Sequence, residues 1–571
     1  MRLTRTLPLA AVLLATPAAA QTPSAALGPC TGGGLPPDAR CGTVQVPENR
    51  AQPGGRQLAL NVVMVPARGG GPARQAMTFF GGGPGQDVAP MAGWAAQHYA
   101  DLREGRDLLF VDQRGTGASA PLVCVLRDPA SPQSYLDDFI PPARAAACRD
   151  SLARTADLTR YTSMDLAHDI EAVRQALGYE QLDLNGGSYG TRAALTYMRA
   201  YPTRVRSAVL VGVVPFGFLQ PAGYAATTDA ALAGILAECG ADAACNAAFP
   251  NVEQEMRAVA ARIQQAPAEA EVLDPVSGRR IRLQLPYGTF AETIRKLMYA
   301  PGPARTIPFL IHRAHQGDYR PLVRAALADR RNSAQSGWGL FLALTCSEDV
   351  PFIDMARAAD DNGRTLLGDY RVRQQAQACA GWPLAHVPAS YHEPLHSDIP
   401  TIVVSGALDP VTPAANGALV ASTLPNAVHV VIPGGAHGPG GMQGAACVDS
   451  LVQAFVRQAS GAGLDVQSCV GRLRPPPFVL DVPEAAAVDQ AHLQRLAGAY
   501  ASANPPLALR VEALEGHIRV AGEGIDDIGT PLSPTRFRLG NGADLQLEFA
   551  ADASTLTVHT PGGAFVLTRQ P

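Results

Sequence analysis

Two hydrophobic patterns alternate along the first part of the chain. Short apolar runs that end in Gly- or Pro-rich turns are typical of buried strands. Longer segments repeat apolar residues every three or four positions, as an amphipathic helix does; Asp165 to Gly178 is one such segment. After a predicted hairpin within 41–67, the expected strands are 77–80, 107–112, 182–184, 208–211, 401–406 and 428–432. This alternation predicts an α/β fold around a mostly parallel sheet.

The pattern changes twice further along the chain. From about 222 to 390 it is mainly helical, with strand alternation only near 280–285, which indicates an inserted helical cap. Beyond the stiff polyproline segment Arg474–Phe478, short strand-like runs from 507 to 567 predict a small all-β domain that opens with a helix over 493–500. The expected organisation is a signal peptide (1–20), a core in two parts (21–221 and 391–477), the cap (222–390), and a linker with a β-rich domain (478–571).

Composition narrows the class of protein. The 571 residues are 47% hydrophobic and 17% charged, which describes an ordinary globular chain with ample core. The formal charge is −4 and no basic cluster is present, which argues against nucleic acid as a partner. No run after the first 20 residues approaches the ~18 apolar residues of a membrane span. The arginines, apolar run and small residues of 1–20 predict a secretory signal cleaved after Ala20, and therefore a periplasmic or secreted protein.

Ten cysteines form an even set, as expected for an exported chain with disulfides. No C-x-x-C motif is present, so a cysteine metal site is not expected. The spacing suggests that neighbours in sequence pair with one another, which gives Cys30–Cys41, Cys124–Cys148, Cys239–Cys245, Cys346–Cys379 and Cys447–Cys469.

The segment Gly186–Gly190 fits the G-x-S-x-G pattern, with a strand-like run before it and a helical pattern after it. This is the context of a nucleophile elbow, which exposes a serine above the end of a sheet. Ser188 is therefore the candidate nucleophile. The backbone N–H of the next residue, Tyr189, points into the same space and can bind a developing oxyanion.

A serine hydroxyl needs a base held by a carboxylate, and in this topology the acid and then the histidine follow the serine in the chain. Asp409 lies in a turn directly after one late strand, and His437 lies in a Gly-rich loop after the next. Taken singly, Asp409 is explained as a turn former before proline, and His437 as an ordinary loop histidine. Their order and their places at strand ends together predict a Ser188–His437–Asp409 triad.

Two other motifs suggest different chemistry. The Gly81–Gly85 loop could be a fragment of a phosphate loop, but no G-K-[ST] follows it, so an oxyanion loop or a plain turn is favoured. His392–His396 matches H-E-x-x-H, but Pro394 opposes the helix that a zinc site requires, and a loop is expected. We therefore expect no metal and no cofactor.

Four motifs together resemble the proline iminopeptidase and tripeptidyl aminopeptidase family: Gly81–Gly85, Phe110–Gly117, Gly186–Thr191 and Gly406–Pro413. The resemblance covers roughly 41–477 and implies an α/β-hydrolase with a helical cap that cuts residues or short peptides from a free N-terminus. It implies that Ser188 is the nucleophile, His437 the base and Asp409 its orienting acid.

The same resemblance implies that Gly82 or Gly83, with Tyr189, supplies the oxyanion donors. Two positions depart from the family pattern: Gly81 stands where proline-releasing relatives often have histidine, and Val211 where relatives often have aspartate. Both departures argue against release of single prolines.

An aminopeptidase must also bind the substrate ammonium, and the candidates are Glu348 and Asp349, with exposed loop acids as the plainer interpretation. Arg114 is expected to be a structural clamp. The predicted function is an exported serine hydrolase acting as an aminopeptidase on peptides. The alternatives are a carboxylesterase acting on small esters with the same triad, and a binding protein on an inactive hydrolase scaffold. Substrate length and oligomeric state are not predicted.

Overall fold

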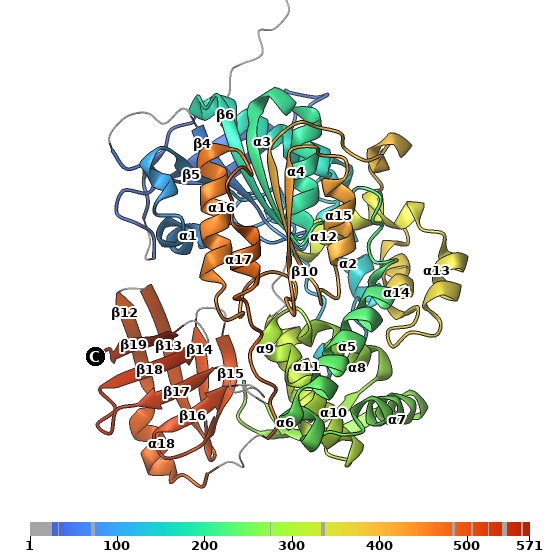
Figure 1. Ribbon diagram of the computed structural model, residues 1–571, viewed down its shortest axis with the longest axis vertical. Coiled ribbons are helices and arrows are strands. Elements are labelled where there is room, and N and C mark those ends of the chain that lie inside the picture. Colours follow the sequence, from blue (N-terminus) through green and yellow to red (C-terminus); the bar gives the residue numbers. More distant parts are fainter. Residues whose placement is uncertain are drawn as a thin grey trace, which may run out of the picture.

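The computed structural model describes residues 25–571 except 32–33, 70–74, 275, 333–336, 482–485, 504–505, 523–524, 540–544 and 561–562. The predicted signal peptide and its cleavage site lie outside the described residues. Figure 1 shows three parts: an α/β core at the top, a helical cap at the lower right, and a β-barrel at the lower left. The predicted fold class is confirmed: an α/β core with a mostly parallel sheet, a helical cap and a C-terminal all-β domain.

The core is a sheet of nine strands in the order β1-β2-β3-β5-β4-β6-β7-β10-β11. Its first strands form the predicted antiparallel hairpin, and all pairings from β5 to β11 are parallel. The bounds are β1 Gly28–Pro29, β2 Arg40–Pro47, β3 Gln57–Val65, β4 Gln75–Phe80, β5 Asp107–Val111, β6 Gln181–Gly187, β7 Val205–Val211, β10 Thr401–Gly406 and β11 Ala427–Ile432.

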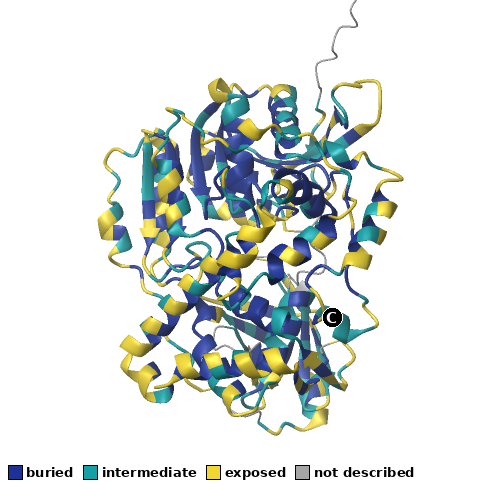
Figure 2. Ribbon diagram, turned by 90° about the vertical axis from the view of Figure 1, so that its right-hand side faces the viewer, coloured by how far each residue is buried: buried dark blue, intermediate teal, exposed yellow. Residues whose placement is uncertain are grey.

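Helices cover both faces of this sheet, which is why central strands such as β4, β5 and β10 are continuous buried apolar runs, whereas β2 and β3 keep an alternating pattern. One core cluster packs α3 (Ser163–Leu177) and α4 (Tyr189–Ala200) against the sheet, and another packs α1 (Ala92–His98) and α16 (Ala446–Gln458). Figure 2 shows the result as a dark blue, buried sheet under helices whose outer sides are exposed.

The cap has a hydrophobic core of its own. Its helices are α5 Tyr224–Ala241, α6 Ala243–Ala248, α7 Val252–Gln265, α8 Tyr287–Leu297, α9 Pro301–Ala304, α10 Ile307–His315 and α11 Arg320–Asn332. A hairpin of β8 (Ala268–Leu273) and β9 (Arg280–Leu285) completes it. The following helices α12 (Trp338–Glu348) and α14 (Tyr370–Cys379) bury their apolar residues in the core cluster of the α/β part, so they tie the cap to the sheet.

The C-terminal strands close into a barrel: β12 Gly498–Ala503, β13 Pro506–Leu514, β14 His517–Gly522, β15 Ile525–Pro531, β16 Arg536–Leu539, β17 Gln546–Phe549, β18 Thr555–Thr560 and β19 Gly563–Arg569. Its interior is packed with side chains such as Tyr500, Phe537 and Phe549. The helix expected over 493–500 is shorter, because α18 (Gln490–Leu496) ends where the backbone becomes extended and Tyr500 belongs to the barrel wall.

The polyproline linker lies against the cap. The Arg305 guanidinium stacks over the Phe478 ring at 4.2 Å, and the next backbone N–H, that of Val479, donates to the Arg305 carbonyl. The linker thereby joins cap and barrel by contact as well as by sequence.

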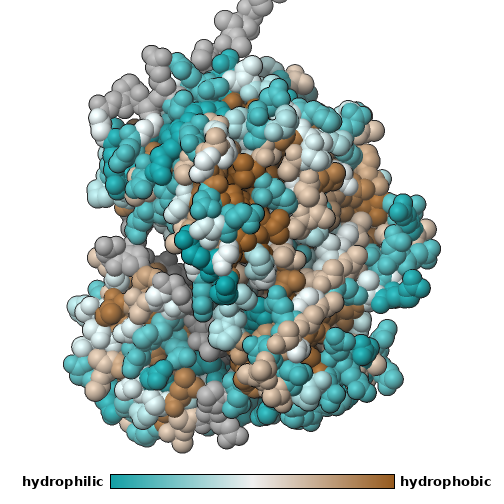
Figure 3. All heavy atoms as spheres, in the orientation of Figure 1, coloured by the Kyte–Doolittle hydropathy of each residue, from teal (hydrophilic) through white to brown (hydrophobic). Residues whose placement is uncertain are grey.

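All five predicted disulfides are present. Each closes a loop of at most 33 residues, so each contributes roughly 2–4 kcal/mol by limiting the unfolded chain. Five disulfides fit a protein of an oxidising compartment. Among the described helices, none combines the length and apolar character that crossing a bilayer requires. Figure 3 shows a largely hydrophilic face, with its hydrophobic atoms gathered chiefly over the α/β part.

Candidate active site

Ser188 occupies a strained turn between β6 and α4. Its φ of 55° and ψ of −127° lie in a region that L-residues rarely adopt, and strained positions of this kind cluster at functional sites. The turn is held from both sides, because the Ser188 N–H donates to the Val211 carbonyl and the Thr191 N–H donates to the Ser188 carbonyl. The geometry is that of the predicted nucleophile elbow.

Glycines let the elbow approach the end of β4. A Cβ on Gly190 would lie 2.1 Å from the Phe80 carbonyl oxygen, so only glycine fits there. A Cβ on Gly82 would lie 3.3 Å from the Cβ of Ser188, which places the Gly82 backbone beside the serine. Gly83 is exposed, and the atoms nearest to it belong to its own loop.

Asp409 and His437 meet across neighbouring strand ends. The His437 Nδ1 lies 2.7 Å from Asp409 Oδ2. The same carboxylate accepts hydrogen bonds from the backbone N–H groups of Val411 and Thr412 and from the Thr412 hydroxyl. Burial by itself would raise the pKa of Asp409, but His437 and these donors outweigh it and lower the pKa below its ordinary value. A buried carboxylate that stays ionised is suited to orient a histidine.

The end of β7 connects the serine to the histidine. Val211 accepts the hydrogen bond from the Ser188 N–H, and a Cβ on the next residue, Gly212, would lie 3.1 Å from His437 Cε1. The imidazole therefore packs against the backbone that also holds the elbow. Its Nδ1 faces Asp409, which leaves Nε2 on the other edge of the ring for a proton from an attacking group.

The cap supplies a wall to this site. Tyr299, just after α8, packs its ring against His437 with centroids 5.2 Å apart, and its carbonyl accepts the His437 N–H. A cavity of about 310 Å³ opens between this part of the cap and the Gly-rich loop after His437. Sequence reasoning missed Tyr299, which stands in no motif, and Thr412, which stands in the Gly406–Pro413 motif without an assigned role.

Glu348 and Asp349 lie at the end of α12, each 2% exposed. Glu348 accepts hydrogen bonds from the Ser163 N–H and hydroxyl and from the Tyr391 hydroxyl, and the Ser163 hydroxyl also bonds the Tyr189 hydroxyl at 2.8 Å. Burial raises the pKa of Glu348 to about 7.

Asp349 pairs with Arg192 of α4 at 2.7 Å. Both carboxylates thus have protein partners beneath the elbow, so an ammonium group could reach them only if these contacts opened. Their role in binding the substrate amine stays a prediction.

The remaining motifs have structural explanations. Arg114 is buried and forms a two-pronged ion pair with Asp169, as expected of a clamp. The H-E-x-x-H segment begins in a short 3-10 helix and continues as extended chain, with His392 Nδ1 3.0 Å from the Phe216 carbonyl oxygen. Within the described residues no cluster of side chains suited to a metal ion is found.

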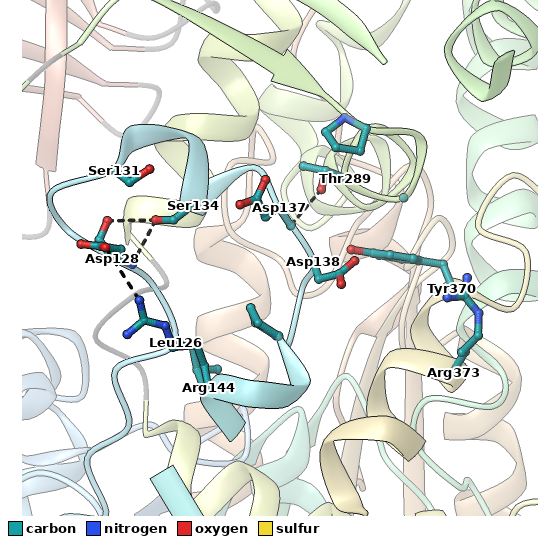
Figure 4. Close-up of a pocket in the computed structure, with 13 residues that line it drawn as sticks. Leu126, Asp128, Ser131, Ser134, Asp137, Asp138, Arg144, Thr289, Tyr370 and Arg373 are labelled. Atoms are coloured by element: carbon teal, nitrogen blue, oxygen red, sulfur yellow. Dashed lines mark hydrogen bonds and ion pairs between the residues drawn. The ribbon is translucent and has the colours of Figure 1, made fainter. Parts of the chain in front are cut away.

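A second cavity, of about 740 Å³, is shown in Figure 4. It is formed by the loop around Asp137 and Asp138, the start of α8, and Tyr370 of α14. The backbone of Asp128 is fixed by Ser134, whose hydroxyl accepts from the Asp128 N–H and donates to the Asp128 carbonyl oxygen, and the Asp128 carboxylate lies 3.7 Å from Arg144. None of the triad residues lines this cavity, so it is separate from the candidate catalytic centre.

Comparison with known families agrees with this geometry. Residues 76–240 match the family described as alpha/beta hydrolase fold, and residues 364–468 match the family described as TAP-like protein. The chain has the α/β-hydrolase fold.

Several of its relatives are named as peptidases. Serine protease Hip1 of Mycobacterium tuberculosis is 25% identical over 466 residues, which cover 74% of this chain and 86% of that protein. Tripeptidyl aminopeptidase of Streptomyces lividans is 27% identical over 418 residues, which cover 66% of this chain and 74% of that protein. Proline iminopeptidase of Arabidopsis thaliana is 29% identical over 144 residues, which cover 25% of this chain and 28% of that protein. The α/β-hydrolase is therefore an enzyme of the serine peptidase and hydrolase class.

Proposed function

We propose that this α/β-hydrolase is an exported aminopeptidase that releases residues or short peptides from free N-termini. The observation that carries the proposal is the Asp409–His437 pair, packed against the same β7 end that holds the strained Ser188 turn. The peptidase relatives favour amide over ester substrates. The five disulfides favour export, with the signal sequence removed after Ala20.

In the proposed reaction the Ser188 hydroxyl attacks the carbonyl carbon while His437 Nε2 takes its proton. Asp409 holds the imidazole in the required tautomer and stabilises the positive charge that forms on it. The backbone N–H groups of Tyr189 and of Gly82 or Gly83 stabilise the oxyanion. His437 then gives its proton to the leaving amine, and water hydrolyses the acyl-enzyme by the same steps in reverse. No cofactor takes part.

The cap supports an exopeptidase over an endopeptidase. Tyr299 and the cap segment after it stand directly over His437 and leave a cavity of about 310 Å³. This volume is at the lower end of the roughly 300–1,000 Å³ of small-molecule sites. This cavity is lined by His437 and not by Ser188, and we propose that it holds the end of a short peptide beside the triad.

The test is hydrolysis of a matched panel by the purified protein. The panel contains prolyl, dipeptidyl and tripeptidyl arylamides with free amines, their N-blocked versions and a simple aryl ester. We expect turnover of free-amine peptides that is lost on blocking, and little release of single prolines. The Ser188→Ala variant should lose about 10³-fold or more of kcat, while Ser397→Ala, in a loop outside the site, should keep full activity.

Ester turnover without amide cleavage would make the protein an esterase. Equal turnover by the Ser188→Ala protein would remove the triad proposal. Absence of any turnover in the folded wild-type protein, over this panel and longer peptides, would favour the binding-protein alternative.

A further inference from the structure

A cavity of about 640 Å³ lies where the cap meets the barrel. Its walls come from β8, β9, α10 and α11 of the cap and from β14, β15 and β16 of the barrel. In Figure 1, α11 and β15 are neighbours at this junction. None of Ser188, Asp409 and His437 lines the cavity, so it is separate from the proposed catalytic site.

Arg538 of β16 reaches this cavity as an unpaired buried cation. The residue is only 5% exposed, and two of its guanidinium nitrogens, Nε and Nη1, find no hydrogen-bond partner among the residues that the structure describes. Burying such a group without a partner costs free energy, because it loses water and gains nothing in return. An unsatisfied buried group in a folded protein therefore needs an explanation.

Arg538 differs from the other arginines that have unpaired buried nitrogens in the described part of the chain. Each of those has a carboxylate or an aromatic ring beside it. The pairs are Arg160 with Asp157, Arg192 with Asp349, Arg313 with Asp318, Arg330 with Phe139, Arg331 with Asp274, and Arg371 with Glu292. Within the described part of the chain, Arg538 has neither an ion pair nor a stacked ring. Asp481 also lines the cavity, and its charge raises the pKa of Arg538 without outweighing burial and Arg324.

A second arginine, Arg324, lines the same cavity. Arg324 of α11 donates to the Thr530 hydroxyl at 3.4 Å, and Thr530 is the cross-strand neighbour of Arg538. Burial and the charge of Arg324 lower the pKa of Arg538 to about 10, and burial also lowers the pKa of Arg324. Two cations thus line the same cavity.

Other carboxylates of the cavity wall are already used by other arginines. Asp318 binds Arg313 at 2.6 Å and Arg320 at 2.7 Å, and Glu271 lies 3.8 Å from Arg280. None of these ion pairs involves the Arg324 or Arg538 guanidinium group. Guanidinium groups bind carboxylate and phosphate groups through paired N–H donors, so this site is suited to an oxyanion.

We propose that the cavity between cap and barrel binds a small organic oxyanion, a carboxylate or a phosphate, through Arg538 and Arg324. The volume exceeds what an inorganic ion needs, which leaves room for an organic body beside the anionic group. Such a ligand would join α11 of the cap to β15 and β16 of the barrel. The barrel would then be a part of a binding site, in addition to covering the cap.

The test is titration calorimetry on the full-length mature protein, in chloride buffer at constant ionic strength. Inorganic phosphate and citrate serve as separate probes, so that the two oxyanion classes are distinguished. We expect the wild-type protein to bind at least one of them, and Arg538→Gln and Arg324→Gln each to weaken that binding about tenfold or more. Arg536→Gln is the matched control, because Arg536 is an exposed arginine of the same strand outside the cavity wall.

Thermal unfolding gives a second readout. Without ligand, Arg538→Met should raise the Tm, because it removes a buried unpaired charge. The probe that binds should raise the Tm of the wild type and leave that of Arg538→Met unchanged. Hydrolysis at Ser188 should continue in all these variants, so failure here is distinct from failure of the proposed function. The proposal is overturned if neither probe binds the wild type at about 10 mM, or if Arg538→Gln binds as tightly as wild type.

Discussion

Two regions beside the Ser188 elbow each bury a carboxylate, and they shift its pKa in opposite directions. Asp409 is 3% exposed and Glu348 is 2% exposed, and each accepts several hydrogen bonds. Asp409 also contacts an imidazole, and its pKa is lowered, whereas Glu348 contacts only neutral donors, and burial raises its pKa to about 7. Burial alone disfavours the charged form, and a cationic or strongly donating neighbour is needed to restore it.

The comparison has a functional meaning. An ionised Asp409 is what a catalytic histidine requires, and a carboxyl group that is half protonated near neutrality is a weak partner for a substrate ammonium. The region around Glu348 instead supports the elbow, because Ser163 connects it to the Tyr189 side chain. Three substitutions separate the two regions.

The largest effect is expected from Asp409→Asn. An amide at this position can donate an N–H to His437 Nδ1, which favours the tautomer that carries its proton on Nε2 and so cannot accept the serine proton there. The amide oxygen can still accept the hydrogen bonds from the backbone N–H groups of Val411 and Thr412. We expect kcat to fall about 10³–10⁴-fold with the fold intact, as measured by steady-state kinetics and circular dichroism. The control is Asp398→Asn, an exposed loop aspartate before β10. Retention of more than a tenth of the activity would show that Asp409 does not orient the base.

A stability effect is expected from Glu348→Gln. Because the pKa of Glu348 is raised in the folded protein, its carboxyl group costs nothing below the unfolded pKa near 4.5 and becomes destabilising as the pH rises through about 7. The neutral amide avoids this cost. The free energy of unfolding of the variant should therefore rise relative to that of wild type between pH 5 and pH 8, by roughly 3 kcal/mol at most. Urea unfolding at several pH values measures the difference.

The control for this comparison is Glu393→Gln, which removes an exposed carboxylate. It should change the free energy of unfolding little at any pH. Parallel pH curves for wild type and Glu348→Gln would mean that Glu348 is ionised in the folded protein. In that case the contrast with Asp409 would be wrong.

The sequence predicted those parts of the site that depend on local chain geometry. A strand followed by a glycine turn places Ser188, Asp409 and His437 at one sheet edge, because the carboxyl ends of parallel strands lie together. The five disulfide pairs were suggested by the short spacing of their cysteines along the sequence. Helical segments of the cap were predicted because their apolar periodicity is local.

The parts that were missed depend on packing between distant segments. Nothing near Tyr299 indicates that it lies against His437, and the sequence does not show that α12 returns to the α/β core and buries Glu348 and Asp349. The junction of Arg324 and Arg538 joins residues of the cap and the barrel that are over 200 positions apart. Periodicity and turn signals cannot predict such contacts, because long-range packing decides them.

The smallest effect is expected from Thr412→Val. The Thr412 hydroxyl donates to Asp409 Oδ2 at 2.7 Å and lies 3.0 Å from His437 Nδ1, so it keeps the carboxylate in line with the imidazole. Valine keeps the shape but loses this donor, and we expect kcat to fall about three- to tenfold with KM nearly unchanged. Thr423→Val, at the end of a helix on the core surface, should leave both constants unchanged. A change in KM alone would assign Thr412 to the shape of the substrate cavity, and unchanged kinetics would mean that the backbone donors of the turn suffice to hold Asp409.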